Sequence, residues 1–293
     1  MYRFLAITVL RFPKHSGGPI QGGRITSLST TREENFFGKF SGTEPSTEGR
    51  YNDLVSQDLR QGGDGSLNVY HWESLASGLA GVWARENTRE AIWDAMARKE
   101  VYATTGGRML VRVFAGWDFE PEEVHRPDFA RQGYECGVPM GGDLTTAPDG
   151  AGGPRFMVRA LRDADGANLD RVQIVKGWLD AGGELQERIY DIAVSDGREI
   201  GADGRATTPV GSTVRGAGYT NTIGDAMLGA FWEDPDFDPA ERAFYYVRVL
   251  EIPTPTWIAY DEAFFGKRDA PDEALRESQE RAYTSPIWYT PDG

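Results

Sequence analysis

Alternating apolar and polar residues dominate the chain after residue 107. The alternating segments run through residues 109–114, 155–161, 169–178, 187–194, 243–252 and 284–289. A side-chain period of two is typical of half-buried antiparallel strands, and Gly-rich and Asp-rich turn signals separate the segments. We therefore predict an antiparallel β-sandwich over residues 108–293 that carries long loops and folds as a unit of its own.

The sequence before this region has a different pattern. Asn87 and Glu90 form a capping-box pattern in front of an apolar face with helical spacing, and residues 101–105 follow as an apolar strand. A helix followed by a strand is typical of an α/β layer. The predicted fold class is therefore α+β, with a partial α/β segment over residues 1–107 followed by the sandwich over residues 108–293.

Charge and cysteine content exclude several classes of function. The chain has 31 Lys and Arg against 45 Asp and Glu, a net charge of −14, which opposes binding to nucleic acid or to an anionic membrane. Its one cysteine, Cys136, excludes an internal disulfide and a Cys-based zinc cluster. The apolar run 4–10 fits a buried strand better than a signal peptide. We expect a soluble protein, with a periplasmic or secreted location left open.

Candidate metal ligands are few. The three histidines, His15, His71 and His125, are too far apart in sequence to form the paired core of a metal site. Oxygen donors crowd residues 163–170, namely Asp163, Asp165, Asn168 and Asp170. They allow either a calcium loop or, more simply, a hairpin with Asp-Gly turn chemistry.

The eight tryptophans also allow two interpretations. They could line a platform for carbohydrate, but in a chain of this size they more often fill the core. We expect the core role and keep sugar binding as an alternative.

Several blocks resemble one family. Residues 33–39, 78–106, 169–180, 244–255 and 282–291 are similar to the bacterial domain-of-unknown-function family 3604, and the resemblance runs from about residue 29 to the C-terminus. That family looks like a branch of the PHP (polymerase and histidinol phosphatase) metallo-hydrolases. The resemblance implies a distorted barrel holding divalent zinc, manganese or iron, and hydrolysis of a small phosphorylated or other anionic substrate.

The chain departs from that pattern in its metal ligands. The His-x-His and Asp-x-His motifs of the family are absent, and His15 stands at a different position. About 107 residues precede the predicted sandwich, whereas a complete barrel needs at least about 200. We expect the chain to match only the C-terminal half of such a protein and to be a catalytically incomplete metal-dependent phosphoesterase. The alternative is a non-catalytic β-sandwich that binds a protein or glycan partner.

The resemblance also implies site residues. It places the block 33–39 at the rim of the metal cleft, so Glu34, Asn35 and Lys39 become candidates for substrate binding and His15 the candidate metal ligand. A structural Glu–Lys pair on the surface is the simpler explanation of Glu34 and Lys39.

Overall fold

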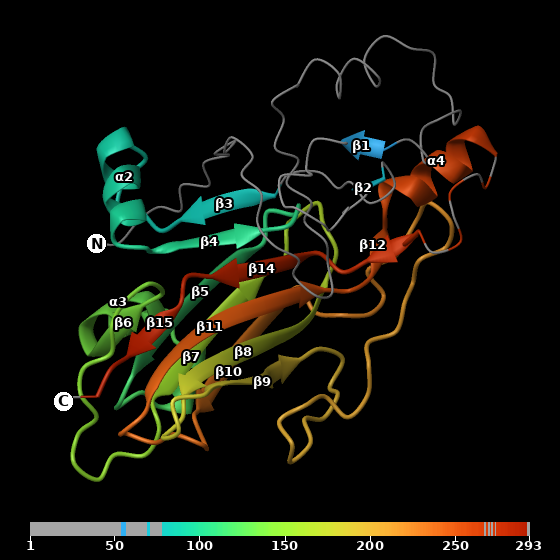
Figure 1. Cartoon of the computed structure of the whole chain (residues 1–293). Coiled ribbons are helices and arrows are strands. Elements are labelled where there is room, and N and C mark those ends of the chain that lie inside the picture. Colours follow the sequence, from blue (N-terminus) through green and yellow to red (C-terminus); the bar gives the residue numbers. More distant parts are fainter. Residues whose placement is uncertain are drawn as a thin grey trace.

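A computed structural model describes residues 78–266, 268, 270, 272 and 274–291, together with the backbone of two short strands, β1 (Leu54–Ser56) and β2 (Val69–Tyr70) (Figure 1). β1 and β2 pair with each other in antiparallel fashion. The rest of the described chain is built mainly from two antiparallel sheets.

The larger sheet has the strand order β3-β4-β14-β11-β8-β9, and β15 pairs with β11 beside it. Its strands are β3 (Leu79–Val82), β4 (Val101–Thr104), β8 (Leu169–Leu179), β9 (Leu185–Val194), β11 (Arg242–Glu251), β14 (Arg281–Thr284) and β15 (Ile287–Tyr289). All of these pairings are antiparallel.

The smaller sheet has the order β10-β7-β5-β6. Its strands are β5 (Leu110–Gly116), β6 (Gly137–Pro139), β7 (Arg155–Leu161) and β10 (Met227–Glu233). A separate ribbon joins β12 (Thr254–Pro255) to β13 (Glu277–Ser278).

The main core lies between the two sheets. Val111 and Val113 of β5 face it from the smaller sheet, and Tyr245, Val247 and Val249 of β11 face it from the larger one. All five are at most 2% exposed. The apolar residues of the alternating pattern thus face the core, and the residues between them face outward.

The helices of the described residues cover only parts of this sandwich. They are α2 (Arg89–Ala97), the 3₁₀ helix η2 (Pro121–His125), α3 (Phe129–Cys136) and α4 (Trp257–Phe265). Phe129 of α3 packs edge-on against Phe114 of β5, with ring centroids 5.4 Å apart, so α3 closes one end of the outer face of the smaller sheet. No described helix is long and apolar enough to cross a membrane.

The predicted α/β segment is wrong. β3 and β4, which flank α2, are antiparallel neighbours, and β4 pairs with β14 at the edge of the larger sheet. An α/β layer needs parallel strands joined by a crossover, so these elements form an edge of the antiparallel sheet and not a remnant of a barrel. The fold is mostly β, as the strand pattern indicated. The division after residue 107 stays a prediction.

The local predictions for individual elements fare better. The strand predicted over residues 155–161 coincides with β7, and those over 169–178 and 243–252 lie within one residue of β8 and β11. The predicted helix is α2, but its N-cap is Thr88 and not Asn87, because the Thr88 hydroxyl oxygen accepts a hydrogen bond from Ala91 N at 3.2 Å.

Candidate carboxyl site at the inter-sheet turn

The chain passes from the larger to the smaller sheet through the turn Thr105–Arg108, which links β4 to β5. β4 and β11 end here and β14 begins, because β14 pairs with both in antiparallel fashion. β7 ends and β5 begins here as well, because these two strands of the smaller sheet are also antiparallel neighbours. The turn after β7 reaches the same place. This topology gathers the carboxyl groups of Asp163, Glu251 and Glu280 around the turn, and we call this group together with Thr105–Arg108 the junction site.

Glu251 is the buried member of the junction site. It ends β11 and is 2% exposed. Its carboxyl group receives a hydrogen bond from the backbone of Ala167, but the buried Oε1 atom has no hydrogen-bond partner. Oε1 lies 3.0 Å from the point that a Cβ atom on Gly107 would occupy. A side chain at position 107 would therefore press against Oε1, and glycine lets the turn lie close to this carboxyl group.

Glu280 stands against the preceding glycine. Its Oε2 atom lies 3.0 Å from the point that a Cβ atom on Gly106 would occupy. The Thr105 hydroxyl donates a hydrogen bond to this carboxylate and accepts one from Arg281 N at 2.9 Å. The half-buried Glu280 side chain is thereby oriented beside the turn.

The carboxyl groups of the site differ in their affinity for protons. Burial and, to a smaller extent, the neighbouring charges of Glu280 and Asp163 raise the pKa of Glu251 to about 8. Although burial opposes ionisation of Asp163, hydrogen bonds from Arg108 N (2.7 Å) and Asp165 N (3.1 Å) hold its pKa below the ordinary value. Neighbouring acids in different protonation states are typical of sites that transfer protons.

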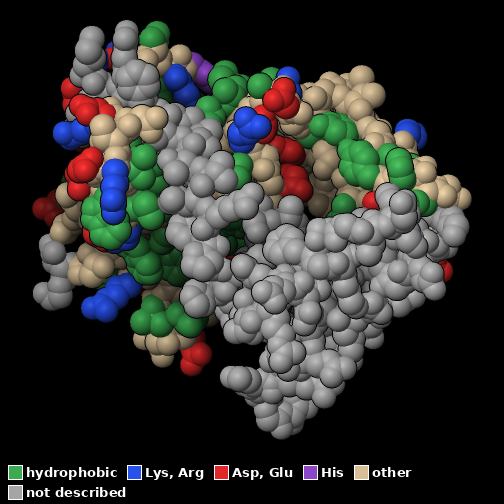
Figure 2. Space-filling view, turned by 90° about the horizontal axis from the view of Figure 1, so that it is seen from above, with side chains coloured by type: hydrophobic (Ala, Val, Ile, Leu, Met, Phe, Trp, Pro, Cys, Tyr) green, Lys and Arg blue, Asp and Glu red, His purple; other side chains and the backbone are tan. Residues whose placement is uncertain are grey.

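Basic and phenolic groups surround the carboxyl groups. The Arg162 guanidinium donates to the carbonyls of the turn after β7, including that of Gly166 at 2.9 Å, and so holds that turn in place. Arg108 is exposed. Tyr219 is half-buried, and burial together with the charge of Glu251 raises its pKa. On the face of the molecule shown in Figure 2, acidic side chains and Lys or Arg side chains lie close together.

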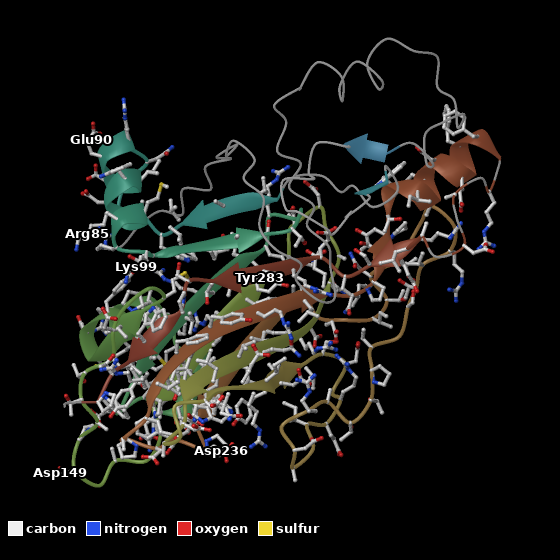
Figure 3. All side chains as sticks on the ribbon, in the orientation of Figure 1. Arg85, Glu90, Lys99, Asp149, Asp236 and Tyr283 are labelled. Atoms are coloured by element: carbon white, nitrogen blue, oxygen red, sulfur yellow. The ribbon has the colours of Figure 1, made fainter. Side chains whose placement is uncertain are left out.

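A second buried polar group lies at the far end of the sandwich, near Asp236, which is labelled in Figure 3. Lys176 Nζ is 2.7 Å from Asp234 Oδ2 and donates to the carbonyl of Asp236 at 2.7 Å. The Tyr245 hydroxyl donates to the same Asp234 oxygen at 2.7 Å. The ammonium and the carboxylate of this group are paired with each other and hydrogen-bonded, which is what a structural ion pair requires.

The oxygen donors of residues 163–170 do not converge on a calcium site. Asn168 Nδ2 donates to backbone carbonyls, including that of Ile223 at 2.9 Å. Asp170 pairs with Arg171 and Arg198. Across the described part of the chain, no group of three or more His, Cys, Asp or Glu residues could hold a metal ion. These residues therefore do not fit the metal centre that the resemblance implies.

The site residues predicted from the sequence, His15, Glu34, Asn35 and Lys39, lie outside the described residues. The junction site itself was not predicted. Glu251 carried a signal, since it is a carboxylate inside the otherwise apolar end of a predicted strand, between Leu250 and Ile252. Glu280 carried none, because only the fold brings it to the turn.

Comparison with known proteins gives a family. No curated protein and no solved structure matches the chain. The model of the family described as "Protein of unknown function (DUF3604)" matches residues 23–291. The match covers nearly the whole sequence and includes the junction site, so the chain belongs to this family of unknown function.

Proposed function

We propose that this chain is a hydrolase in which Glu251 donates a proton and Glu280 accepts one at the junction site. The observation that carries the proposal is the Oε1 atom of Glu251, which is buried, has no hydrogen-bond partner and lies close to Gly107. A buried acid of this kind is costly to keep and is typical of a group that acts on a ligand.

The two carboxyl groups have complementary roles. Glu280, held by the Thr105 hydroxyl, takes a proton from a water molecule as this water attacks the substrate. Glu251 gives its proton to the leaving oxygen, which departs as an alcohol. A proton then returns from Glu280 to Glu251 through solvent, which restores both groups. No step passes through a metal ion.

The position of Arg108 favours a small anionic substrate. Its side chain is exposed and forms no ion pair with any described residue. It can therefore bind a carboxylate or phosphate group of the substrate. The net charge of −14 opposes a long polyanion, which leaves small esters as the favoured substrate class.

The test is hydrolysis of p-nitrophenyl carboxylates, phosphate monoesters and phosphodiesters by the whole chain, with and without EDTA. Loss of a positioned general acid costs typically about 10²- to 10⁴-fold, so we expect Glu251→Gln to lower the rate at least about 100-fold. The matched control is Glu122→Gln, which changes an exposed carboxylate of η2 and should leave the rate unchanged.

Two results contradict the proposal. One is the absence of turnover with every ester. The other is a rate that EDTA abolishes and Glu251→Gln leaves intact, which would return the chain to the metal-dependent phosphoesterase that the resemblance implies.

A further inference from the structure

Four aromatic side chains form a row on the outer face of the larger sheet. In order they are Trp288 of β15, Phe244 and Tyr246 of β11, and Tyr283 of β14. Their strand neighbours, among them Tyr245 and Ile287, face the core. Since side chains alternate along a strand, the row must face outward. We call these four residues the aromatic row.

The rings of the aromatic row touch in sequence. Ring centroids are 5.3 Å apart for Trp288 and Phe244, 6.5 Å for Phe244 and Tyr246, and 6.4 Å for Tyr246 and Tyr283. The planes of Phe244 and Tyr246 differ by only 9°. The row is therefore a continuous aromatic surface across three strands.

Gly177 leaves room for the Phe244 ring of the row to lie flat against the sheet. It stands opposite Phe244 in the pairing of β8 with β11. A Cβ atom at position 177 would overlap the far edge of the Phe244 ring. The ring therefore reaches across the neighbouring strand and does not stand upright on its own.

The row is open to solvent and has polar neighbours. Trp288 is 42% exposed, the other three are half-buried, and none of the described helices crosses the ribbons of β8, β11 and β14 in Figure 1. Tyr283 is labelled in Figure 3. Arg248 extends the same face of β11 and donates from Nε to Gln173 at 2.7 Å. Burial raises the pKa of Tyr246, and the exposed carboxylate of Glu187 is close enough to contribute to this rise.

We propose that the aromatic row binds a neutral polysaccharide. The C–H faces of pyranose rings pack on aromatic rings, and carboxylate, guanidinium and phenol groups at the side can hydrogen-bond to sugar hydroxyls. Aromatic rows also stack nucleic-acid bases, but such sites need a basic groove. The net charge of −14 disfavours nucleic acids and acidic polysaccharides alike. The site does not depend on the junction site, which uses other residues.

The test is affinity electrophoresis of the whole chain in gels that contain hydroxyethylcellulose, xylan or dextran, with polygalacturonate and a single-stranded DNA oligonucleotide as anionic comparisons. We expect at least one neutral polysaccharide to retard the protein. Trp288→Ala should weaken this retardation at least about tenfold, as loss of an aromatic anchor commonly does, and Trp288→Phe should restore part of it.

Trp93→Ala is the matched control, because Trp93 of α2 is 69% exposed and does not belong to the row. It should bind like the original protein. The melting temperature of each variant shows that it is folded, and light scattering measures its mass. The proposal is overturned if no neutral polysaccharide binds or if only the anionic polymers bind. It is equally overturned if Trp93→Ala weakens binding as much as Trp288→Ala, or if the protein is a dimer that Trp288→Ala dissociates.

Discussion

At the scale of single residues, the fold buries the carboxyl group of Glu251 where water cannot solvate its charge. Its pKa is about 8 in the folded chain against an ordinary value of 4.5. The folded state thus keeps a proton that the unfolded state loses first as the pH rises. The stability that comes from this proton is full below about pH 4.5 and is lost as the pH rises through about 8.

This difference predicts a change in pH dependence for Glu251→Gln. Between about pH 5 and pH 8, the original chain should lose up to about 1.4 kcal/mol of stability per pH unit relative to the variant, which cannot ionise. Urea unfolding at several pH values measures the difference, and Glu122→Gln should not show it. Parallel stability curves for Glu251→Gln and the original chain would mean that Glu251 is already ionised near neutral pH.

The glycine in front of Glu251 gives a second test at this scale. A methyl group on Gly107 would lie 3.0 Å from Glu251 Oε1 and 3.9 Å from the Asp163 Cβ atom, so it would press against the Glu251 carboxyl group. We expect Gly107→Ala to lower ester hydrolysis at least about tenfold, because substrate can no longer reach the carboxyl group, while thermal unfolding stays cooperative. Gly218→Ala is the control, since a Cβ atom there meets Arg215 O only at 3.8 Å. Full activity in Gly107→Ala would place the reaction elsewhere.

At the scale of elements, the N-cap residue of α2 in the structure differs from the one that the sequence pattern predicted. Thr88 caps the helix, although Asn87 with Glu90 matched the capping box. We expect Thr88→Ala to cost about 1 kcal/mol of stability and Asn87→Ala to cost little. Urea unfolding of both variants checks this order, and a larger loss in Asn87→Ala would restore the cap predicted from the sequence.

The sequence predicts the strands, which depend on the local periodicity of apolar side chains. It does not predict the relative direction of strands, which depends on their partners. Alternation located β7, β8 and β11 because one face of each strand is buried. The block β3-α2-β4 looked like an α/β layer because a helix-then-strand pattern does not say which way the strands run. The antiparallel pairings of β3 with β4 and of β4 with β14 decide this, and β14 lies far along the chain. The junction site was missed for the same reason.

The pairing of β4 with β14 predicts where a stable core begins. Tyr102 of β4 is 3% exposed within the main core, so losing β4 would open the core and expose the edge of β14. Limited proteolysis of the whole chain should leave a resistant fragment that begins before β3 and not near residue 108. A stable fragment starting between residues 100 and 112 would instead support the domain division predicted from the sequence.

At the scale of the whole molecule, the sandwich supports two separate surfaces. The turn between its sheets carries the carboxyl groups of the junction site, and the outer face of the larger sheet carries the aromatic row. Our two proposals assign binding of a neutral polymer to the open face and hydrolysis of a small ester to the end of the sandwich. The two claims fail independently, because Trp288 and Glu251 lie on different parts of the fold.

The central claim is that the fold keeps the Glu251 carboxyl group protonated near neutral pH. The most direct measurement is a carbon-13 NMR titration of the glutamate carboxyl groups in the whole chain, with the Glu251 signal assigned by its absence in Glu251→Gln. The account predicts that this signal titrates with a pKa of about 8, above the ordinary value of 4.5. A Glu251 signal that titrates near 4.5 would contradict it and leave the junction site without its acid.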